Sequence, residues 1–176
     1  FLENTVSVIA HFMRVPVCSI YLFDEKSNRL ILKGTHGLNQ SMVGTTSLKY
    51  GEGLVGLTLK QLQSLRVTGA SESDSYQAVE GLNEEAYESF LAVPITRGLH
   101  KIGVLVVQKK LKGSFSNRSV QTLEIIASQL TSVMETAGFL FTMLNDGSPE
   151  VATPLVVSNI SSIKGKVASP GYAVGP

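Results

Sequence analysis

The residue pattern in this chain most typical of a chemical function is the run Gly51-Glu52-Gly53-Leu54-Val55-Gly56, which matches G-x-G-x-x-G. A short predicted strand at 47–50 precedes the run and a predicted helix at 54–63 follows it. In that context such glycines can hold the pyrophosphate of a dinucleotide at a helix amino terminus. That fingerprint belongs to a parallel, doubly wound sheet, however, whereas this chain reads as antiparallel hairpins. We therefore interpret the run as a tight turn into a helix, whose amino terminus at Gly53 could still favour an anionic ligand group.

The cysteine and histidine residues do not form a catalytic or metal-binding pattern. Cys18 is the only cysteine and lies within a predicted strand. Nucleophilic or redox chemistry needs a thiolate, usually beside a histidine or a second cysteine, and no such pairing is visible, so we expect a packed thiol. His11, His36 and His100 lack metal-ligand spacing. The sequence thus predicts no catalytic residue and no metal site, and a lone cysteine is most simply explained by a reducing cytoplasm.

A polar, acidic stretch from Gly69 to Glu88 has no strong periodicity. Six of the fourteen acidic residues of the chain fall between residues 72 and 88. A segment of this length within a compact domain is usually a functional loop or lid, although a solvated surface loop would have the same composition. Both interpretations stay open, and Tyr76 and Tyr87 favour the lid because they offer contact area that a solvated loop does not need.

Charged residues in and beside this stretch could bind a ligand. The carboxylates of Glu84 and Glu85 could meet an amino group. Arg66, in a short strand predicted at 64–68, is the better partner for a ligand carboxylate because guanidinium binds carboxylates through two hydrogen bonds. Arg97 flanks a predicted turn and is expected to be exposed. The candidate ligand-binding residues are Arg66, Tyr76, Glu84, Glu85, Tyr87 and Gly53.

These residues must be positioned by a sheet whose centre is the stretch from Ser89 to Lys110. It contains two apolar runs joined at Arg97-Gly98-Leu99-His100, which predicts a β-hairpin. Apolar residues occupy both odd and even positions in each run, so both faces of these strands should be covered. Pro94 cannot donate to a ladder, and we expect a bulge or a locally unpaired edge there.

Helices are predicted near the two ends of the chain, and a second hairpin is predicted after the first helix. Residues 2–13 have apolar residues at helical spacing, and 17–23 and 29–35 read as a second hairpin. Ser116 or Asn117 should cap a long helix that runs to residue 144. Its apolar stripe is wider than a small sheet can cover, which suggests a helical partner from a second subunit. The predicted fold class is α+β: an antiparallel sheet with the terminal helices on one face, and loops and short helices over a ligand pocket on the other.

Length and charge exclude several classes of protein. The chain has 176 residues and a formal net charge of +1, without a basic stripe, so nucleic acid is not expected as a partner. No apolar run approaches the ~18 to 20 residues that span a bilayer, and no signal peptide is visible, so no membrane partner is expected.

Four sequence blocks resemble the GAF domain family in their order and spacing. These blocks are Val17-Cys18-Ser19-Ile20-Tyr21-Leu22, Gly51-Glu52-Gly53-Leu54-Val55-Gly56, Ser89-Phe90-Leu91-Ala92-Val93-Pro94-Ile95 and Gly103-Val104-Leu105-Val106-Val107-Gln108. The tail from Ile163 to Pro176 resembles the opening of enzyme I of the phosphoenolpyruvate phosphotransferase system. The combination resembles the nitrogen-type enzyme I. It implies a GAF sensory domain at 1–144, a linker at 145–162 and the truncated start of the phosphotransferase N-terminal domain at 163–176.

The resemblance implies a regulatory domain whose parent takes phosphate from phosphoenolpyruvate onto a histidine and passes it to a phosphocarrier protein. That histidine lies beyond the opening motif, so this chain should have no turnover and no cofactor, while Mg²⁺ is expected for the complete enzyme. Glutamine or 2-oxoglutarate is the implied effector, and a homodimer through helices 2–13 and 117–144 is expected. Some GAF domains resemble methionine sulfoxide reductases that use several cysteines, which one cysteine disfavours. A ligand-free dimerisation or interaction module is the remaining alternative.

Overall fold

The core of the protein is a six-stranded antiparallel sheet. The computed structural model describes residues 1–146, with side chains as far as residue 137. The strands are β1 (Val17–Asp24), β2 (Arg29–His36), β3 (Ser47–Lys49), β4 (Leu65–Thr68), β5 (Ser89–Arg97) and β6 (His100–Lys109). Their order across the sheet is β3-β2-β1-β6-β5-β4, with antiparallel pairing throughout. The predicted hairpin of β5 and β6 therefore lies within the sheet, as its two-sided apolar pattern indicated.

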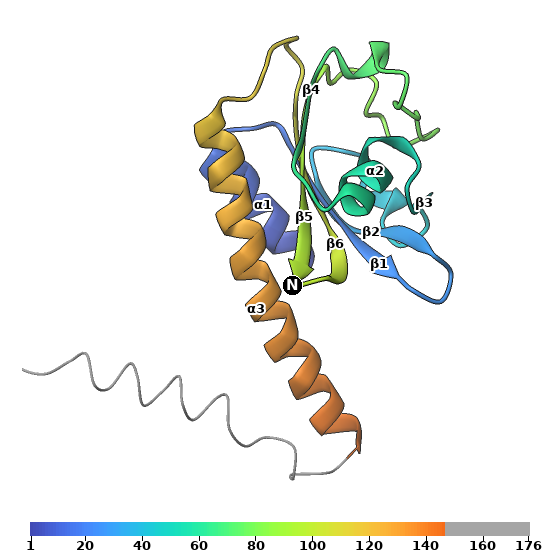
Figure 1. The fold of residues 1–176 in the computed structure, drawn as a ribbon, viewed down its shortest axis with the longest axis vertical. Helices are drawn as coiled ribbons and strands as arrows, with labels where there is room; N and C mark the ends of the chain where they lie inside the picture. The colour runs from blue at the N-terminus through green and yellow to red at the C-terminus, as the bar shows by residue number, and fades with distance from the viewer. Residues whose placement is uncertain (147–176) are drawn as a thin grey trace, which may run out of the picture. The chain divides into compact units, whose positions relative to one another are not determined.

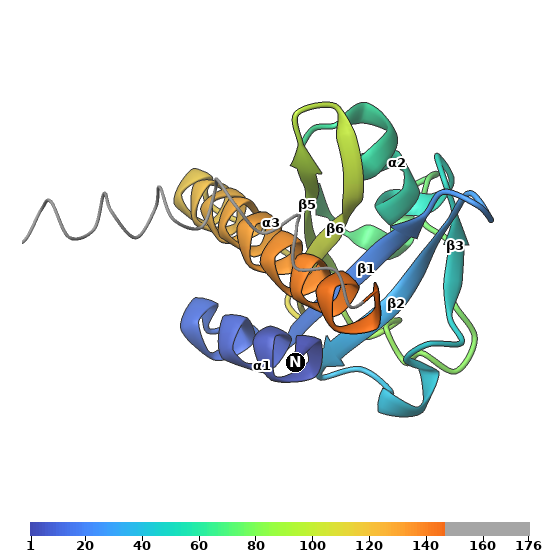
Figure 2. The same cartoon turned by 90° about the horizontal axis from the view of Figure 1, so that it is seen from below.

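The helices divide between the two faces of this sheet. They are α1 (Leu2–Met13), α2 (Gly53–Gln61) and α3 (Asn117–Asp146), with single 3₁₀ turns at η1 (Gln40–Met42) and η2 (Ala70–Glu72). Residues 1–133 form one compact unit, and a second unit starts at Met134. Within the first unit, α1 and α3 cover one face, whereas α2 and the loops lie over the other (Figures 1 and 2). The predicted α+β class and layer arrangement are confirmed.

Successive side chains along each strand point to opposite faces of the sheet, so each face has its own core. On β1, Val17 and Tyr21 pack with α2 and the loops, and Cys18 and Ile20 point to the opposite, helix-covered face. All four side chains are buried. On the helix-covered face α1 lies close to the sheet, because a Cβ added to Gly34 would sit 3.2 Å from the backbone of Leu2 and 3.3 Å from Ile20. Burial on both sides explains why apolar residues fill odd and even positions.

Pro94 is accommodated differently from the sequence prediction. It pairs in register with Val104 of β6, and the irregularity falls one step later, between Ile95 and Thr96. On its other side, β5 is paired with β4 only over Ser89 to Ala92. The sheet edge is therefore open beside Pro94, where a strand residue needs no N–H donor. The expectation of an unpaired edge holds for the β4 side, and the expected bulge is displaced by one residue.

The helix ends follow from capping chemistry. The Ser116 hydroxyl accepts a hydrogen bond from the Ser119 N–H at 3.1 Å, so Ser116 is the residue that caps α3. Helix α1 ends at Arg14, which has a left-handed φ of 54°, two residues before Pro16. Along the described part of the chain, no helix is both long and apolar enough to cross a membrane. Most of the predicted linker and all of the predicted phosphotransferase segment lie outside the described residues.

Candidate ligand-binding site

Residues 69–88, which we call the lid loop, pack on the same face of the sheet as α2. Ala70 and Leu82 of the lid loop are fully buried in the core of this face. Asn39 holds the loop near its tip: its backbone N–H donates to the Leu82 carbonyl at 3.2 Å, and its side-chain amide donates to the Gly81 carbonyl at 2.8 Å. The segment is thus anchored to the core at these positions, while many of its other residues are exposed to solvent.

Glu84 is a lid-loop residue whose carboxyl is strongly perturbed by its surroundings. Its side chain is partly buried, and burial raises the pKa of its carboxyl from 4.5 to about 7. The neighbouring charge of Glu85 raises the pKa further, while hydrogen bonds from the Val79 backbone and the Gln108 side chain act in the opposite direction. The donors to this carboxylate are therefore neutral groups, which satisfy its lone pairs without balancing its charge.

Two tyrosines lie close to Glu84. Among the described residues, the Tyr76 hydroxyl is buried without a hydrogen-bond partner. Burial, followed by the charges of Glu84, Glu85 and Glu88, raises the pKa of Tyr76 to about 12. Burial and the charge of Glu84 also raise the pKa of Tyr21, on β1. Both phenols therefore stay protonated at neutral pH and can donate hydrogen bonds.

The sheet beneath the lid loop carries buried polar groups among its apolar residues. The hydroxyls of Ser19 on β1 and Thr35 on β2 are 2.7 Å apart, and each residue is at most 1% exposed. Gln108 of β6, which is 2% exposed, pairs with Val17 and so lies on the same face. Burying such groups in an apolar core costs free energy unless hydrogen bonds compensate. We call the set of Ser19, Tyr21, Thr35, Tyr76, Glu84 and Gln108 the polar cluster.

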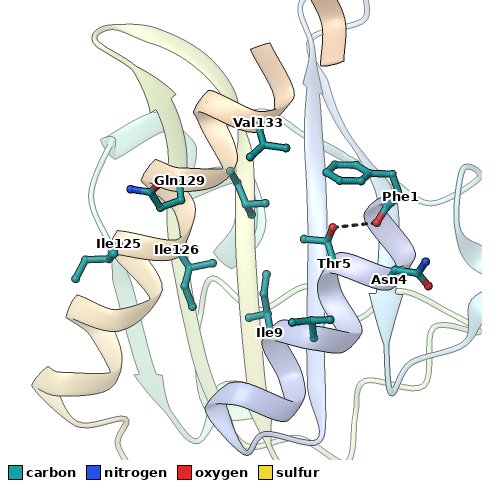
Figure 3. Close-up of a pocket in the computed structure, with 10 residues that line it drawn as sticks. Phe1, Asn4, Thr5, Ile9, Ile125, Ile126, Gln129 and Val133 are labelled. Carbon is teal, nitrogen blue, oxygen red and sulfur yellow. Dashed lines mark hydrogen bonds between the residues drawn. The ribbon is translucent and has the colours of Figure 1, made fainter. Parts of the chain in front are cut away.

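A concave feature lies on the opposite, helix-covered face. A groove of about 430 Å³ runs between α1 and the part of α3 from residue 125 to residue 133 (Figure 3). Phe1, Val8 and Ile125 along it are 69%, 68% and 63% exposed. The groove is lined by Phe1, Asn4, Thr5, Val8, Ile9, Ile125, Ile126, Gln129, Leu130 and Val133. Its lining is mainly apolar, which is typical of a protein contact and offers few groups to orient a polar metabolite.

Comparison with known proteins identifies the family. The sequence profile described as "GAF domain" matches residues 1–135. The chain belongs to the GAF domain family.

Two solved GAF domains are similar to this one in sequence as well as in fold. The GAF domain of an Acinetobacter phosphoenolpyruvate-protein phosphotransferase is 35% identical, with a TM-score of 0.70. The corresponding domain from Coxiella burnetii is 27% identical, with a TM-score of 0.75. Each comparison covers 80% of this chain and 84% of the other. The fold and the predicted resemblance to phosphotransferase GAF domains are thereby confirmed.

A longer protein of the phosphotransferase system is also similar to this chain in sequence. Over 94 residues, or 53% of this chain, the sequence is 32% identical to a protein of Escherichia coli named "Phosphoenolpyruvate-dependent phosphotransferase system". The matched stretch is only 13% of that protein. The chain therefore spans only a small part of that relative, and the activity of such a protein comes to this chain only as a proposal.

The structure brings most of the predicted ligand-binding residues of this GAF domain to one face. Tyr76 and Tyr87 pack against the core beneath the lid loop, and Glu84 lies beside Tyr76. Gly53, the first residue of α2, faces the lid loop as well, because a Cβ added to it would sit 3.6 Å from the side chain of Gln77. Glu85 is on the same loop but exposed.

The structure does not place Arg66 beside the other predicted ligand-binding residues. Its guanidinium donates hydrogen bonds to the Phe115 carbonyl at 2.7 Å and to the Asn117 side-chain oxygen at 2.9 Å. Its strand neighbours Leu65 and Val67 pack against the core under the lid loop, so Arg66 points to the opposite face of the sheet. The prediction that Arg66 meets a ligand carboxylate beside the lid loop does not fit this placement.

Sequence reasoning missed the sheet half of the polar cluster. Ser19, Thr35 and Gln108 belong to strands that were interpreted as purely structural. The available signal was a polar residue in an otherwise apolar strand, as in VCSIYLF and GVLVVQ. In a central strand that is buried on both sides, such a side chain can point to either face of the sheet. Only the strand register shows which face it is.

The glycine run and the cysteine behave as the sequence predicted. Gly56 allows a close approach, since a Cβ there would lie 2.5 Å from the Lys49 carbonyl oxygen, so the run is a packed turn into α2. Cys18 is fully buried, and burial raises the pKa of its thiol to about 12. The packed thiol is confirmed. Among the described residues, no group of three or more His, Cys, Asp or Glu side chains could hold a metal ion.

Proposed function

We propose that this GAF domain is the regulatory, small-molecule-sensing domain of a cytoplasmic phosphoenolpyruvate-dependent protein phosphotransferase. The parent would transfer phosphate from phosphoenolpyruvate, with Mg²⁺, to a histidine outside this chain and then to a phosphocarrier protein. Support comes from the Acinetobacter, Coxiella and Escherichia coli relatives and from the tail sequence after Ile163. In this proposal the domain itself has no turnover.

The observation that carries the ligand proposal is the environment of Glu84. Its carboxyl is turned toward the core and held by neutral donors, and its pKa is raised to about 7. A ligand ammonium group beside it would favour the charged form and compensate for the burial. The buried phenol of Tyr76, which lacks a hydrogen-bond partner, offers a donor or acceptor next to that position. We infer a ligand that carries an ammonium group and further hydrogen-bonding groups.

This chemistry favours glutamine over 2-oxoglutarate as the nitrogen-status effector. At neutral pH glutamine carries one ammonium group, one carboxylate and a neutral side-chain amide, whereas 2-oxoglutarate carries two carboxylates and no cationic group. The two carboxylates of 2-oxoglutarate would meet the negative charges of Glu84, Glu85 and Glu88, all of which act on Tyr76. Binding of glutamine would hold the lid loop closed, and α3 would carry the change toward the following domain by a shift between two populations.

The test is thermal unfolding of the 176-residue chain with glutamine, with 2-oxoglutarate and with other amino acids. Ligand at ~100 times its dissociation constant should add about 2.7 kcal/mol, and each kcal/mol should raise Tm by roughly 2–4 °C. Glu84→Gln should abolish the rise, because a neutral amide cannot balance an ammonium group. Glu80→Gln, at an exposed position of the same loop, is the matched control. Absence of a saturable shift with any amino acid would contradict the proposal.

A second candidate function is supported by the groove between α1 and α3. Its apolar, exposed lining is the surface expected of a homodimer contact through helices 2–13 and 117–144. In a ligand-free dimerisation module, the polar cluster would be a purely structural network. The two functions are separable, because the first requires a ligand response and the second only a concentration-dependent association.

A further inference from the structure

The segment between β6 and α3, residues 110–116, lies against both ends of the lid loop. The Thr68 hydroxyl, just before the loop, donates to the Gly113 carbonyl at 3.2 Å. Ser89, just after the loop, accepts a hydrogen bond from the Gly113 N–H at 2.9 Å. The two ends of the loop are also joined to each other, since the Ala70 N–H donates to the Glu88 carbonyl at 2.9 Å. Gly113 is therefore bonded to the strand residues at both ends of the lid loop.

Ser89 is the most constrained of these contacts. It is 2% exposed, and its hydroxyl oxygen lies 2.6 Å from both the Leu111 and the Gly113 carbonyl oxygens. A serine hydroxyl has one proton, so it can donate to only one of these two carbonyls at a time. Ser89 therefore joins the end of the lid loop to both Leu111 and Gly113 within one packed site.

An ion pair reinforces the same junction. Lys112 donates to both carboxylate oxygens of Glu72, each at 2.8 Å, and so joins the segment to the first turn of the lid loop. Gly69, at the start of the loop, has a φ of +70°, and a Cβ there would lie 2.8 Å from Lys112 Cε. The backbone of the loop thus approaches Lys112 as closely as a residue without a side chain allows.

The other end of the segment is fixed to α3. Phe115 is 2% exposed, with the Lys109 ammonium 4.6 Å from its ring centroid. Arg66 binds the Phe115 carbonyl and the Asn117 side chain, and Ser116 caps the first turn of the helix. Gly113 lies two residues before Phe115, so a displacement of Gly113 acts next to this fixed end of the segment.

We propose that residues 110–116 are a coupling segment that transmits movement of the lid loop to the first turn of α3, with Ser89 as its pivot. A packed junction whose hydrogen bonds connect the lid loop to the start of the helix can transmit a displacement from one to the other. The coupling is the route by which the proposed ligand response would reach α3, and in that respect it rests on the proposed function. It exists without a ligand, however, and can be tested without one.

The test is hydrogen–deuterium exchange of the 176-residue chain after the lid loop has been loosened by substitution. Leu82→Ala removes a fully buried side chain of the lid loop. Leu82 makes no hydrogen bond to the coupling segment. Asn39→Ala is a milder variant, which removes the side-chain bond to Gly81, in case the first does not fold. Leu30→Ala, a fully buried position on β2 that faces away from α3, is the control for a general loss of stability.

We expect loosening of the lid loop to accelerate exchange of the amides at 113–120 by roughly tenfold, which corresponds to about 1.4 kcal/mol of local stability. The control should change these amides only in proportion to the whole unit. In a Ser89→Ala background the same loosening should accelerate them much less, because the pivot is missing. Unchanged exchange at 113–120, or equal acceleration with and without Ser89, would overturn the proposal. Neither result depends on whether glutamine binds.

Discussion

The guanidinium of Arg66 donates a hydrogen bond of 2.7 Å to the backbone carbonyl of Phe115. With its second bond, to the Asn117 side chain, it ties the edge strand β4 to the residues that begin α3. Hydrogen bonds from a charged donor contribute more than neutral ones. The contact lies on the face of the sheet away from the polar cluster, which makes Arg66 a residue of the helix junction.

Arg66→Met should therefore destabilise the domain without weakening ligand binding. We expect a loss of about 1–3 kcal/mol in the free energy of unfolding by urea, because the Phe115 carbonyl loses its donor. The glutamine-induced shift in Tm should stay the same size. Arg118→Met, at an exposed position in the first turn of α3, is the control. A variant of normal stability that no longer responds to glutamine would instead make Arg66 a ligand-binding residue.

Arg66 also shows where sequence reasoning is limited. Strand periods, helix stripes and caps are local, and they predicted the layers, the central hairpin and Ser116 as a possible cap. The side of the sheet to which Arg66 points depends on the register of a four-residue strand, and a shift of one residue reverses it. The lid-loop residues Tyr76 and Glu84 were found because composition marks a loop. Gln108 was missed because a single polar residue in an apolar strand does not reveal its partner.

Glu84 makes stability depend on pH. Its pKa is about 7 in the folded state and 4.5 in its ordinary state, so between these values the folded protein binds more protons than the unfolded chain. The free energy of unfolding should then fall as pH rises from about 4.5 to 7, by at most about 3 kcal/mol, and this contribution should be constant above that window.

Urea unfolding of the wild type and Glu84→Gln from pH 4.5 to 8 measures this contribution. The difference between the two should change across the window, with the variant relatively more stable at pH 8. Glu80→Gln should follow the wild type, since that position is exposed. Parallel curves for Glu84→Gln and the wild type would show that the carboxyl is solvated in solution.

The Tyr76 hydroxyl should affect stability and binding in opposite directions. A buried hydroxyl without a partner costs free energy, so Tyr76→Phe should be neutral or should stabilise the ligand-free domain by about 1 kcal/mol. The same variant should bind glutamine more weakly, as isothermal titration would show, because the ligand loses a hydrogen-bond partner. A clear loss of stability without ligand would indicate that the hydroxyl already has a partner.

Cys18 should be unreactive while the domain is folded. Its thiol is fully buried with a pKa raised to about 12, and only the thiolate attacks disulfide reagents. Labelling with an aromatic disulfide at pH 8 should therefore track unfolding as urea is increased. Fast labelling of the native protein would contradict this and would reopen a redox role.

The groove between α1 and α3 makes a prediction about association. If two copies meet there, Ile125, which is 63% exposed in one copy, becomes buried in the dimer. Replacing it by aspartate should remove roughly 1.5–3 kcal/mol of apolar burial from each copy, which weakens the dimer by about a hundredfold or more. Sedimentation equilibrium of the wild type and Ile125→Asp measures the change.

Ser128→Asp adds the same charge to the same helix outside the groove and should leave association intact. Equal weakening by both variants would assign the effect to net charge, and a wild type that is monomeric at high concentration would remove the dimer altogether. The ligand response through Glu84 lies on the other face of the sheet and should survive in Ile125→Asp, because the two surfaces share no residue.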